Sequence, residues 1–144
     1  MDISALRRQH DEIGLTARLL RQAISDDRLP RSVAALRWQL ARQLMAHLAL
    51  EDGILYPALE RSLSGETRER AIALRKDTGA LADRFAIYLA TWSDDRIAAE
   101  WPAFCKETRI ILDTLNSRIE RENRLLYPLA AAAMDRNRPA ARRA

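Results

Sequence analysis

Glycine, cysteine and runs of β-branched residues, which many non-helical folds depend on, are scarce in this sequence. Its 144 residues include four glycines, two histidines and one cysteine, and runs of β-branched residues are almost absent. Alanine, leucine and arginine are abundant instead, and this composition favours helix throughout the chain. The lone Cys105 excludes an internal disulfide and is more typical of a small apolar packing residue than of a nucleophile. An all-α domain that folds without covalent crosslinks is therefore predicted.

Targeting and membrane signals are missing as well. No charged start followed by an apolar stretch opens the chain, and no apolar run is long enough to span a bilayer, so we expect a cytoplasmic protein without membrane association. The formal net charge is +4. The arginines nevertheless alternate with acidic residues, as in residues 68–70, which is typical of a solvated helix face rather than a nucleic-acid surface. Only residues 135–144 are locally basic, and we expect them to form a disordered tail.

Apolar residues recur at alternating steps of three and four in four segments, which is the spacing of one face of a helix. These stripes cover residues 3–24, 33–54, 71–92 and 104–125. Short connections between successive segments favour antiparallel neighbours. Residues 1–134 are therefore predicted to form an up-down-up-down antiparallel four-helix bundle. Pro57 is expected to end or kink the second helix, and Pro128 to end the fourth, because proline clashes with the preceding turn.

Titratable side chains interrupt the stripes at positions that should face the core. They are His10, His47, Glu51, Arg118 and Glu122. Burying such groups without partners is costly, so they must pair with one another, bind a metal or reach water. The expected helix directions bring all of them to one level of the bundle. A single polar cluster inside the bundle is the simplest arrangement.

The second half of the chain repeats the first. Residues 47–57 align without gaps with residues 118–128, and a shorter upstream match places His10 opposite Thr78. The first half presents two histidines and a glutamate, whereas the second half presents Thr78, Arg118 and a glutamate at the corresponding places. The halves are expected to be related by a pseudo-twofold axis through the polar cluster.

A histidine in the first helix, then His-x-x-x-Glu leading to Tyr-Pro, then a related pattern again, resembles the hemerythrin-like HHE cation-binding family over roughly residues 3–130. In that family two irons are held by five histidines and two bridging carboxylates. Position by position, the resemblance implies the metal ligands His10, His47, Glu51 and Glu122. Thr78 and Arg118 stand where the family has histidines, and the chain has no other histidine to replace them. The resemblance therefore implies the fold and a degenerate site, and a di-iron centre is not expected.

Three interpretations of the cluster remain open. In the first, it binds one divalent metal (Fe, Zn or Mn), with an open position for a small ligand. In the second, no metal binds; Arg118, which has only donors and no lone pair, neutralises the buried carboxylates, and the bundle is a regulatory or protein-interaction scaffold. The third is an enzyme with His10 or His47 as base beside Glu51, although nothing specifies a nucleophile, an oxyanion hole or a cofactor loop.

The remaining aromatic and apolar residues are interpreted mainly as structural. Tyr56 and Tyr127 are expected to cap the core at its polar end. A group of large apolar residues lies off the second stripe and is compatible with a homodimer surface or a protein partner: Trp38, Leu48, Leu55 and Leu59.

Overall fold

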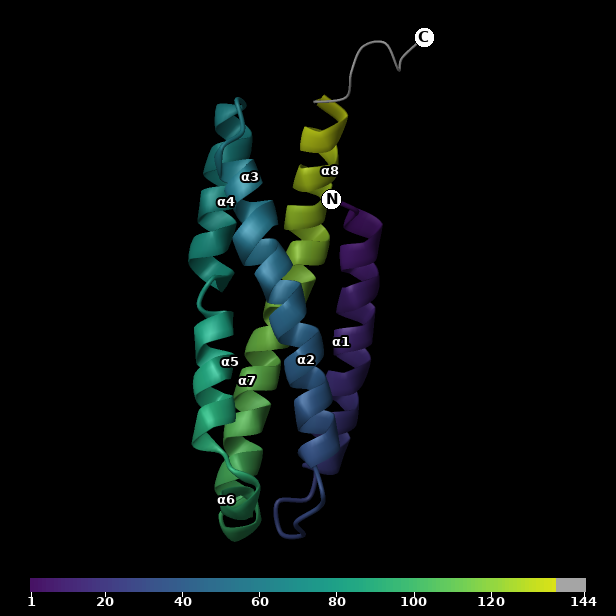
Figure 1. Ribbon diagram of the computed structural model, residues 1–144, viewed down its shortest axis with the longest axis vertical. Coiled ribbons are helices and arrows are strands. Elements are labelled where there is room, and N and C mark those ends of the chain that lie inside the picture. Colours follow the sequence, from purple (N-terminus) through teal and green to yellow (C-terminus); the bar gives the residue numbers. More distant parts are fainter. Residues whose placement is uncertain (137–144) are drawn as a thin grey trace.

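The structure is a computed structural model that describes residues 1–136, and all of their regular secondary structure is helical (Figure 1). The elements are α1 (Ile3–Ala23), α2 (Ala34–Leu50), η1 (Glu51–Leu55), α3 (Tyr56–Glu60), α4 (Gly65–Thr78), α5 (Leu81–Thr91), α6 (Asp94–Ala99), α7 (Trp101–Arg121), η2 (Glu122–Leu126) and α8 (Tyr127–Arg136). The expected all-α class is confirmed. Helix α8 extends into the predicted tail, 135–144, and the rest of that tail lies outside the described residues.

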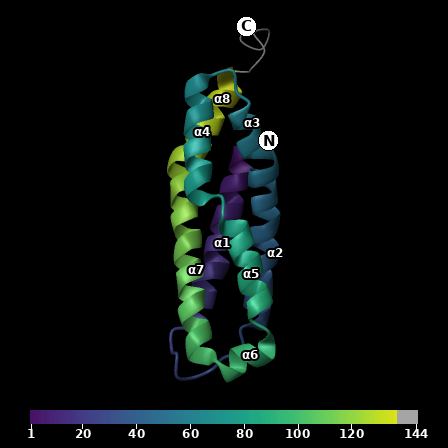
Figure 2. The same ribbon diagram turned by 90° about the vertical axis from the view of Figure 1, so that its left-hand side faces the viewer.

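The helical segments form a long bundle (Figures 1 and 2). Helix α1 descends in the view of Figure 1, α2, η1 and α3 ascend as one continuous run, α4 and α5 descend end to end, and α7, η2 and α8 ascend. The short α6 makes the lower connection between α5 and α7. The four stripes predicted one helix each, whereas two of the runs contain a π-helical turn and a third is broken between α4 and α5. None of the helices in residues 1–136 is both long and apolar enough to cross a membrane.

The interior consists of two apolar clusters with polar residues between them. One cluster includes Ile13 and Leu44, and the other includes Leu6 and Leu55. His10 lies between the two clusters along α1, and Glu51 and Glu122 lie between them along their own runs. His47 and Arg118 each lie one turn before these glutamates, at the edge of the first cluster. Because apolar packing closes the layer from both ends, its polar groups must find their partners within it.

Each π-helical turn shifts the inward face of its helix by one residue. The sequence pattern predicted that Ile54 and Leu125 face the core, but they are 53% and 43% exposed. The next residues along the chain, Leu55 and Leu126, are buried instead. A π-turn contains one residue more than an α-turn, so a stripe of steps of three and four fails immediately after it.

The prolines mark these turns rather than helix ends. In η1 and η2 the backbone N–H groups of Tyr56 and Tyr127 donate to carbonyl oxygens five residues earlier. Pro57 and Pro128 then occupy the first turn of α3 and α8, where a missing N–H costs least. The expectation that the fourth helix ends at Pro128 was therefore wrong, since α8 continues to Arg136.

The surface predicted from off-stripe residues is largely core. Leu48, Leu55 and Leu59 are buried within the chain, and of that group only Trp38 is substantially exposed. A buried charge also escaped prediction: Arg37 is 1% exposed, and its guanidinium donates to the backbone oxygens of Leu89 and Trp92 near the end of α5. Carbonyls at the C-terminal end of a helix lack intrahelical partners, so Arg37 satisfies groups that would otherwise be buried unpaired.

The break between α4 and α5 depends on Gly79. A Cβ added there would lie 2.6 Å from the backbone oxygen of Arg75, whereas one added at Gly14 in α1 would meet nothing within 4 Å.

We predict that Gly79→Ala destabilises the fold by about 1–3 kcal/mol, the usual range for overpacking, because the backbone must move to admit the methyl group. Gly14→Ala should instead stabilise it by about 0.5–1 kcal/mol through the improved helix propensity. Chemical denaturation of the two variants beside the wild type measures both effects. Equal stability of the two variants would contradict the steric argument.

Candidate metal centre

Four side chains that the sequence singled out as ligands converge between the two apolar clusters. His10 comes from α1, His47 from α2, Glu51 from η1 and Glu122 from η2, and each is no more than 2% exposed. One potential ligand atom from each residue lies within 4.8 Å of those of the other three. The cluster therefore has the residue types and the compactness of a metal-binding site.

Both imidazole rings are oriented by side-chain amides. The Nδ1 atom of His10 lies 2.8 Å from the Oδ1 atom of Asn123, and that of His47 lies 2.6 Å from the Oε1 atom of Gln9. An amide oxygen can only accept a hydrogen bond, so Nδ1 carries a proton in each ring. The Nε2 atoms are left to face the cluster, as in metal-binding histidines whose other ring nitrogen donates to an oxygen.

The Nε2 atoms face carboxylate oxygens at short range. His47 Nε2 lies 3.1 Å from Glu51 Oε1, and His10 Nε2 lies 3.2 Å from Glu122 Oε1. Glu122 Oε1 is buried and has no hydrogen-bond partner within residues 1–136. A neutral Nε2 and a carboxylate oxygen both present lone pairs, so each pair needs a positive charge between them, either a proton or a metal ion. The donor set and the orphaned oxygen fit a metal ion.

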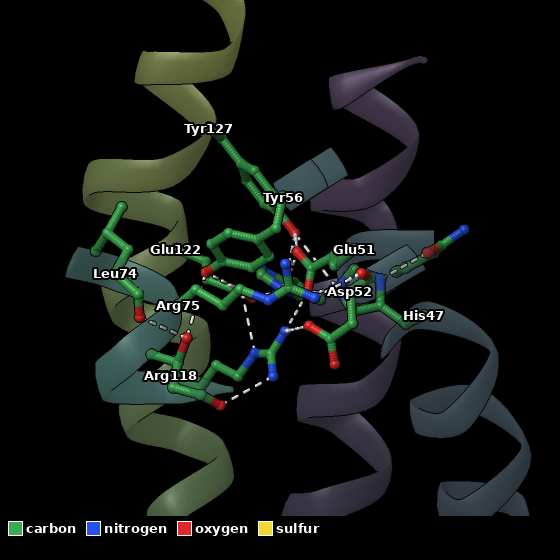
Figure 3. A network of polar contacts seen from close by, with 12 residues as sticks. His47, Glu51, Asp52, Tyr56, Leu74, Arg75, Arg118, Glu122 and Tyr127 are labelled. Atoms are coloured by element: carbon green, nitrogen blue, oxygen red, sulfur yellow. Dashed lines mark hydrogen bonds and ion pairs between the residues drawn. The ribbon is translucent and has the colours of Figure 1, made fainter. Parts of the chain in front are cut away.

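Tyr127 lies directly against the histidines. Its hydroxyl donates to Glu51 Oε2 at 2.7 Å and lies 2.9 Å from His10 Nε2 and 3.3 Å from His47 Nε2 (Figure 3). The expectation that this tyrosine only caps the core missed these contacts.

Tyr56 is placed in the same way in the other half of the cluster. Its hydroxyl donates to Glu122 Oε2 at 3.0 Å and lies 3.3 Å from Thr78 Oγ1. Each tyrosine therefore contacts the glutamate that belongs to the opposite half of the repeat. The repeated Tyr-Pro dipeptide was the signal for this role in the sequence.

Arg118 bridges the two glutamates. Its guanidinium donates through Nε to Glu122 at 3.0 Å and through Nη2 to Glu51 at 3.3 Å and to Asp52 at 2.9 Å (Figure 3). Its Nη1 donates to the backbone oxygen of Thr78 at 3.0 Å. That oxygen belongs to the last residue of α4, where the helix dipole favours a cation. The carbonyl left without an intrahelical partner at the end of α4 thus accepts a hydrogen bond from the buried guanidinium of Arg118.

A comparison with family models matches residues 1–130 to the hemerythrin HHE cation-binding domain. The chain belongs to the hemerythrin HHE family. No curated protein and no solved structure matched it. The resemblance recognised in the sequence is thereby confirmed. Thr78 and Arg118 take part in the cluster, as hydrogen-bonding and charged groups.

The buried charges of this hemerythrin-domain cluster shift the pKa values of its ionisable groups. Burial by itself lowers the pKa of His10, but its hydrogen bonds and the two glutamate charges outweigh burial and raise the pKa above 6.5. Burial would raise the pKa of Glu51, yet its hydrogen bond and electrostatic interaction with His47, and hydrogen bonds from other groups, hold it at about 2. The pKa of Glu122 is raised, first by burial and also by the charge of Glu51. The two carboxylates therefore differ in how readily they accept a proton.

Sequence reasoning missed three residues of the site. Gln9 and Asn123 each stand next to a predicted ligand in the sequence but orient a histidine on a different helix. Asp52, adjacent to a predicted ligand, binds the guanidinium of Arg118. Beyond their position beside a polar stripe residue, nothing in the sequence distinguishes these side chains from solvated ones.

A groove of about 370 Å³ lies between the α4–α5 break and α7. Thr78 and Arg118 form part of its lining, together with the more exposed Arg84 and Arg121. The groove therefore borders the part of the cluster that contains Thr78 and Arg118.

We predict that Arg118→Leu destabilises the chelator-treated protein by about 3–5 kcal/mol, because it leaves two buried carboxylates without their counter-charge. Arg121→Leu is the matched control. Arg121 pairs with Asp77 at the surface, at 2.7 Å, and its loss should cost no more than about 1 kcal/mol. Denaturant titrations measure both values, and similar small effects for the two variants would contradict a structural role for the buried guanidinium.

Proposed function

We propose that this hemerythrin-domain protein binds a single divalent metal ion through His10, His47, Glu51 and Glu122. The observation that carries the proposal is the pair of short contacts between imidazole Nε2 atoms and carboxylate oxygens, with the Nδ1 atoms already committed to amides. Two imidazoles and two carboxylates suit Fe, Zn or Mn, and ligand softness does not choose among them.

One ion rather than two is expected because of Arg118. Its guanidinium has no lone pair for a metal, and its positive charge opposes a second cation beside Glu51 and Glu122. Burial lowers the pKa of Arg118, but Glu122, Glu51 and Asp52 outweigh burial and raise it, so the group stays charged. We therefore propose that the guanidinium of Arg118 stands in place of a second metal ion in the second half of the site.

The protein residues define what the bound ion would do. They hold it in a layer closed by apolar packing at both ends and exclude bulk water from it. When bound, a metal with an open position supplies Lewis acidity and, if it is iron, one-electron redox chemistry. Nothing in residues 1–136 specifies a nucleophile or an oxyanion hole, and we propose reversible small-ligand binding or sensing rather than turnover.

We also infer that the bundle is an up-down-up-down four-helix bundle built from two related halves. Support comes from the π-helical turns η1 and η2, which occupy corresponding places in the repeat. The reciprocal contacts of Tyr56 and Tyr127 with the glutamates of the opposite halves support a pseudo-twofold relation through the cluster.

A metal-free scaffold is the second candidate, and the contacts of Arg118 favour it. One guanidinium already neutralises part of the charge of Glu51 and Glu122, and protons can supply the remainder. In that case the bundle would serve as a regulatory or protein-interaction module with an internal ion-pair network.

We predict one equivalent of metal per chain after chelator-treated, tag-free protein is incubated with Zn(II), Mn(II) or Fe(II) and desalted. His47→Ala should lose the ion. Thr78→Ala should keep it, because Thr78 aligns with the ligand His10 in the repeat but is not itself a proposed ligand. Elemental analysis measures the stoichiometry. Metal at one hundred times its Kd should also stabilise the fold by about 2.7 kcal/mol. If none of the three metals changes the melting temperature and none is retained after desalting, the metal-free scaffold is the correct alternative.

The double variant Thr78→His/Arg118→His tests why only one ion is expected. It returns two imidazoles to the second half of the cluster and removes the guanidinium, so we predict that a second equivalent of Fe(II) binds. Arg118→His alone removes the charge but supplies fewer ligands, and it should bind the second ion more weakly. If the double variant still binds one equivalent while remaining folded, Arg118 and Thr78 are not what limits the metal content.

A further inference from the structure

The hydroxyl of Tyr127 is surrounded by acceptors. It lies within 3.3 Å of Glu51 Oε2 and of the Nε2 atoms of both His10 and His47. A phenol has one hydrogen to donate, and the hydrogen bond to Glu51 uses it. With Nδ1 protonated in each ring, the two Nε2 atoms present lone pairs to the phenol oxygen. The oxygen thus lies where three potential metal-binding residues converge.

The corresponding residue of the other half has a different environment. Tyr56 contacts Glu122 and Thr78, and the guanidinium carbon of Arg118 lies 5.9 Å from its ring centroid. Within residues 1–136, none of its polar contacts is to an imidazole. The two tyrosines are therefore a natural matched pair, equal in chemistry and burial but different in what they face.

Local structure fixes the position of the Tyr127 oxygen. The side chain is fully buried and directly follows η2, whose extra residue brings both Glu122 and Tyr127 to the inward face. Its ring packs against that of His10, with ring centroids 4.9 Å apart. A side chain held in this way cannot withdraw from an ion bound by the histidines without opening the apolar cluster above it.

We propose that Tyr127 is a further ligand of the metal ion, which it binds through its phenolate oxygen beside His10, His47, Glu51 and Glu122. This inference rests on the proposed metal-binding function. As the metal–oxygen bond forms, the phenolic proton leaves Tyr127 and is released to solvent, as metal ligands generally bind in their deprotonated form. The half of the site that keeps its histidines is thereby completed by a residue from the other half of the repeat.

The test uses Fe(III) as the probe, because a phenolate bound to Fe(III) gives a charge-transfer band in the visible region. Full-length wild type, Tyr127→Phe and Tyr56→Phe are stripped of metal, loaded with Fe(III) and desalted, and iron content and visible spectra are recorded. We expect the band in the wild type and in Tyr56→Phe, and its loss in Tyr127→Phe while iron is retained. A band that survives in Tyr127→Phe, or iron-loaded wild type without a band, overturns the assignment of Tyr127 and leaves metal binding intact.

A second measurement needs only the wild type and covers the case in which Tyr127→Phe does not fold. Addition of Zn(II) to the metal-free protein should produce the ultraviolet difference spectrum of one ionised tyrosine per ion bound. Bound Zn(II) without that spectrum overturns the assignment of Tyr127 alone. Absence of both Zn(II) and Fe(III) from the desalted protein overturns the proposed metal-binding function, and the tyrosine ligand with it.

Discussion

The interior of this bundle is organised by the need to compensate two buried carboxylates. Glu51 and Glu122 lie between apolar clusters that exclude water, and one guanidinium, from Arg118, reaches both of them. A buried ion pair is weak evidence of stability in itself, but removing one of its partners is strongly unfavourable. Arg118 supplies one positive charge against two negative ones. The remainder must come from protons or from a metal ion, and this requirement links the fold to the proposed function.

The π-helical turns make that arrangement geometrically possible. Each turn begins with a glutamate of the site and is followed by a tyrosine, and the extra residue lets both side chains face inward. In an uninterrupted α-helix a spacing of five residues would turn them toward different faces. The same turns place each proline in the first turn of the helix that follows, where a missing N–H costs least. Two features of the repeated segment, its Tyr-Pro ending and its glutamate, therefore have one common structural cause.

Much of this could be predicted from the sequence. Helical class, the polar layer and the participation of Arg118 followed from spacing, because positions three and four apart share a helix face whatever the tertiary structure. The inward face beyond Glu51 was misplaced, as Ile54 shows, since proline was interpreted as a helix end rather than as the sign of a π-turn. Gln9 and Asn123 could not be assigned, because their role depends on the relative heights of different helices, which a single sequence does not contain.

The division of the core by a polar layer has a consequence for how the molecule unfolds. Separate apolar clusters within one domain can open as separate units, and how independently they do so depends on what joins them. In this bundle the two clusters are joined by the charged layer, whose side chains come from each of the long helical runs. If the proposed metal ion replaces a proton in this layer, it changes how strongly the layer joins the two clusters, and the occupant of the site then affects whether the two ends of the bundle unfold together.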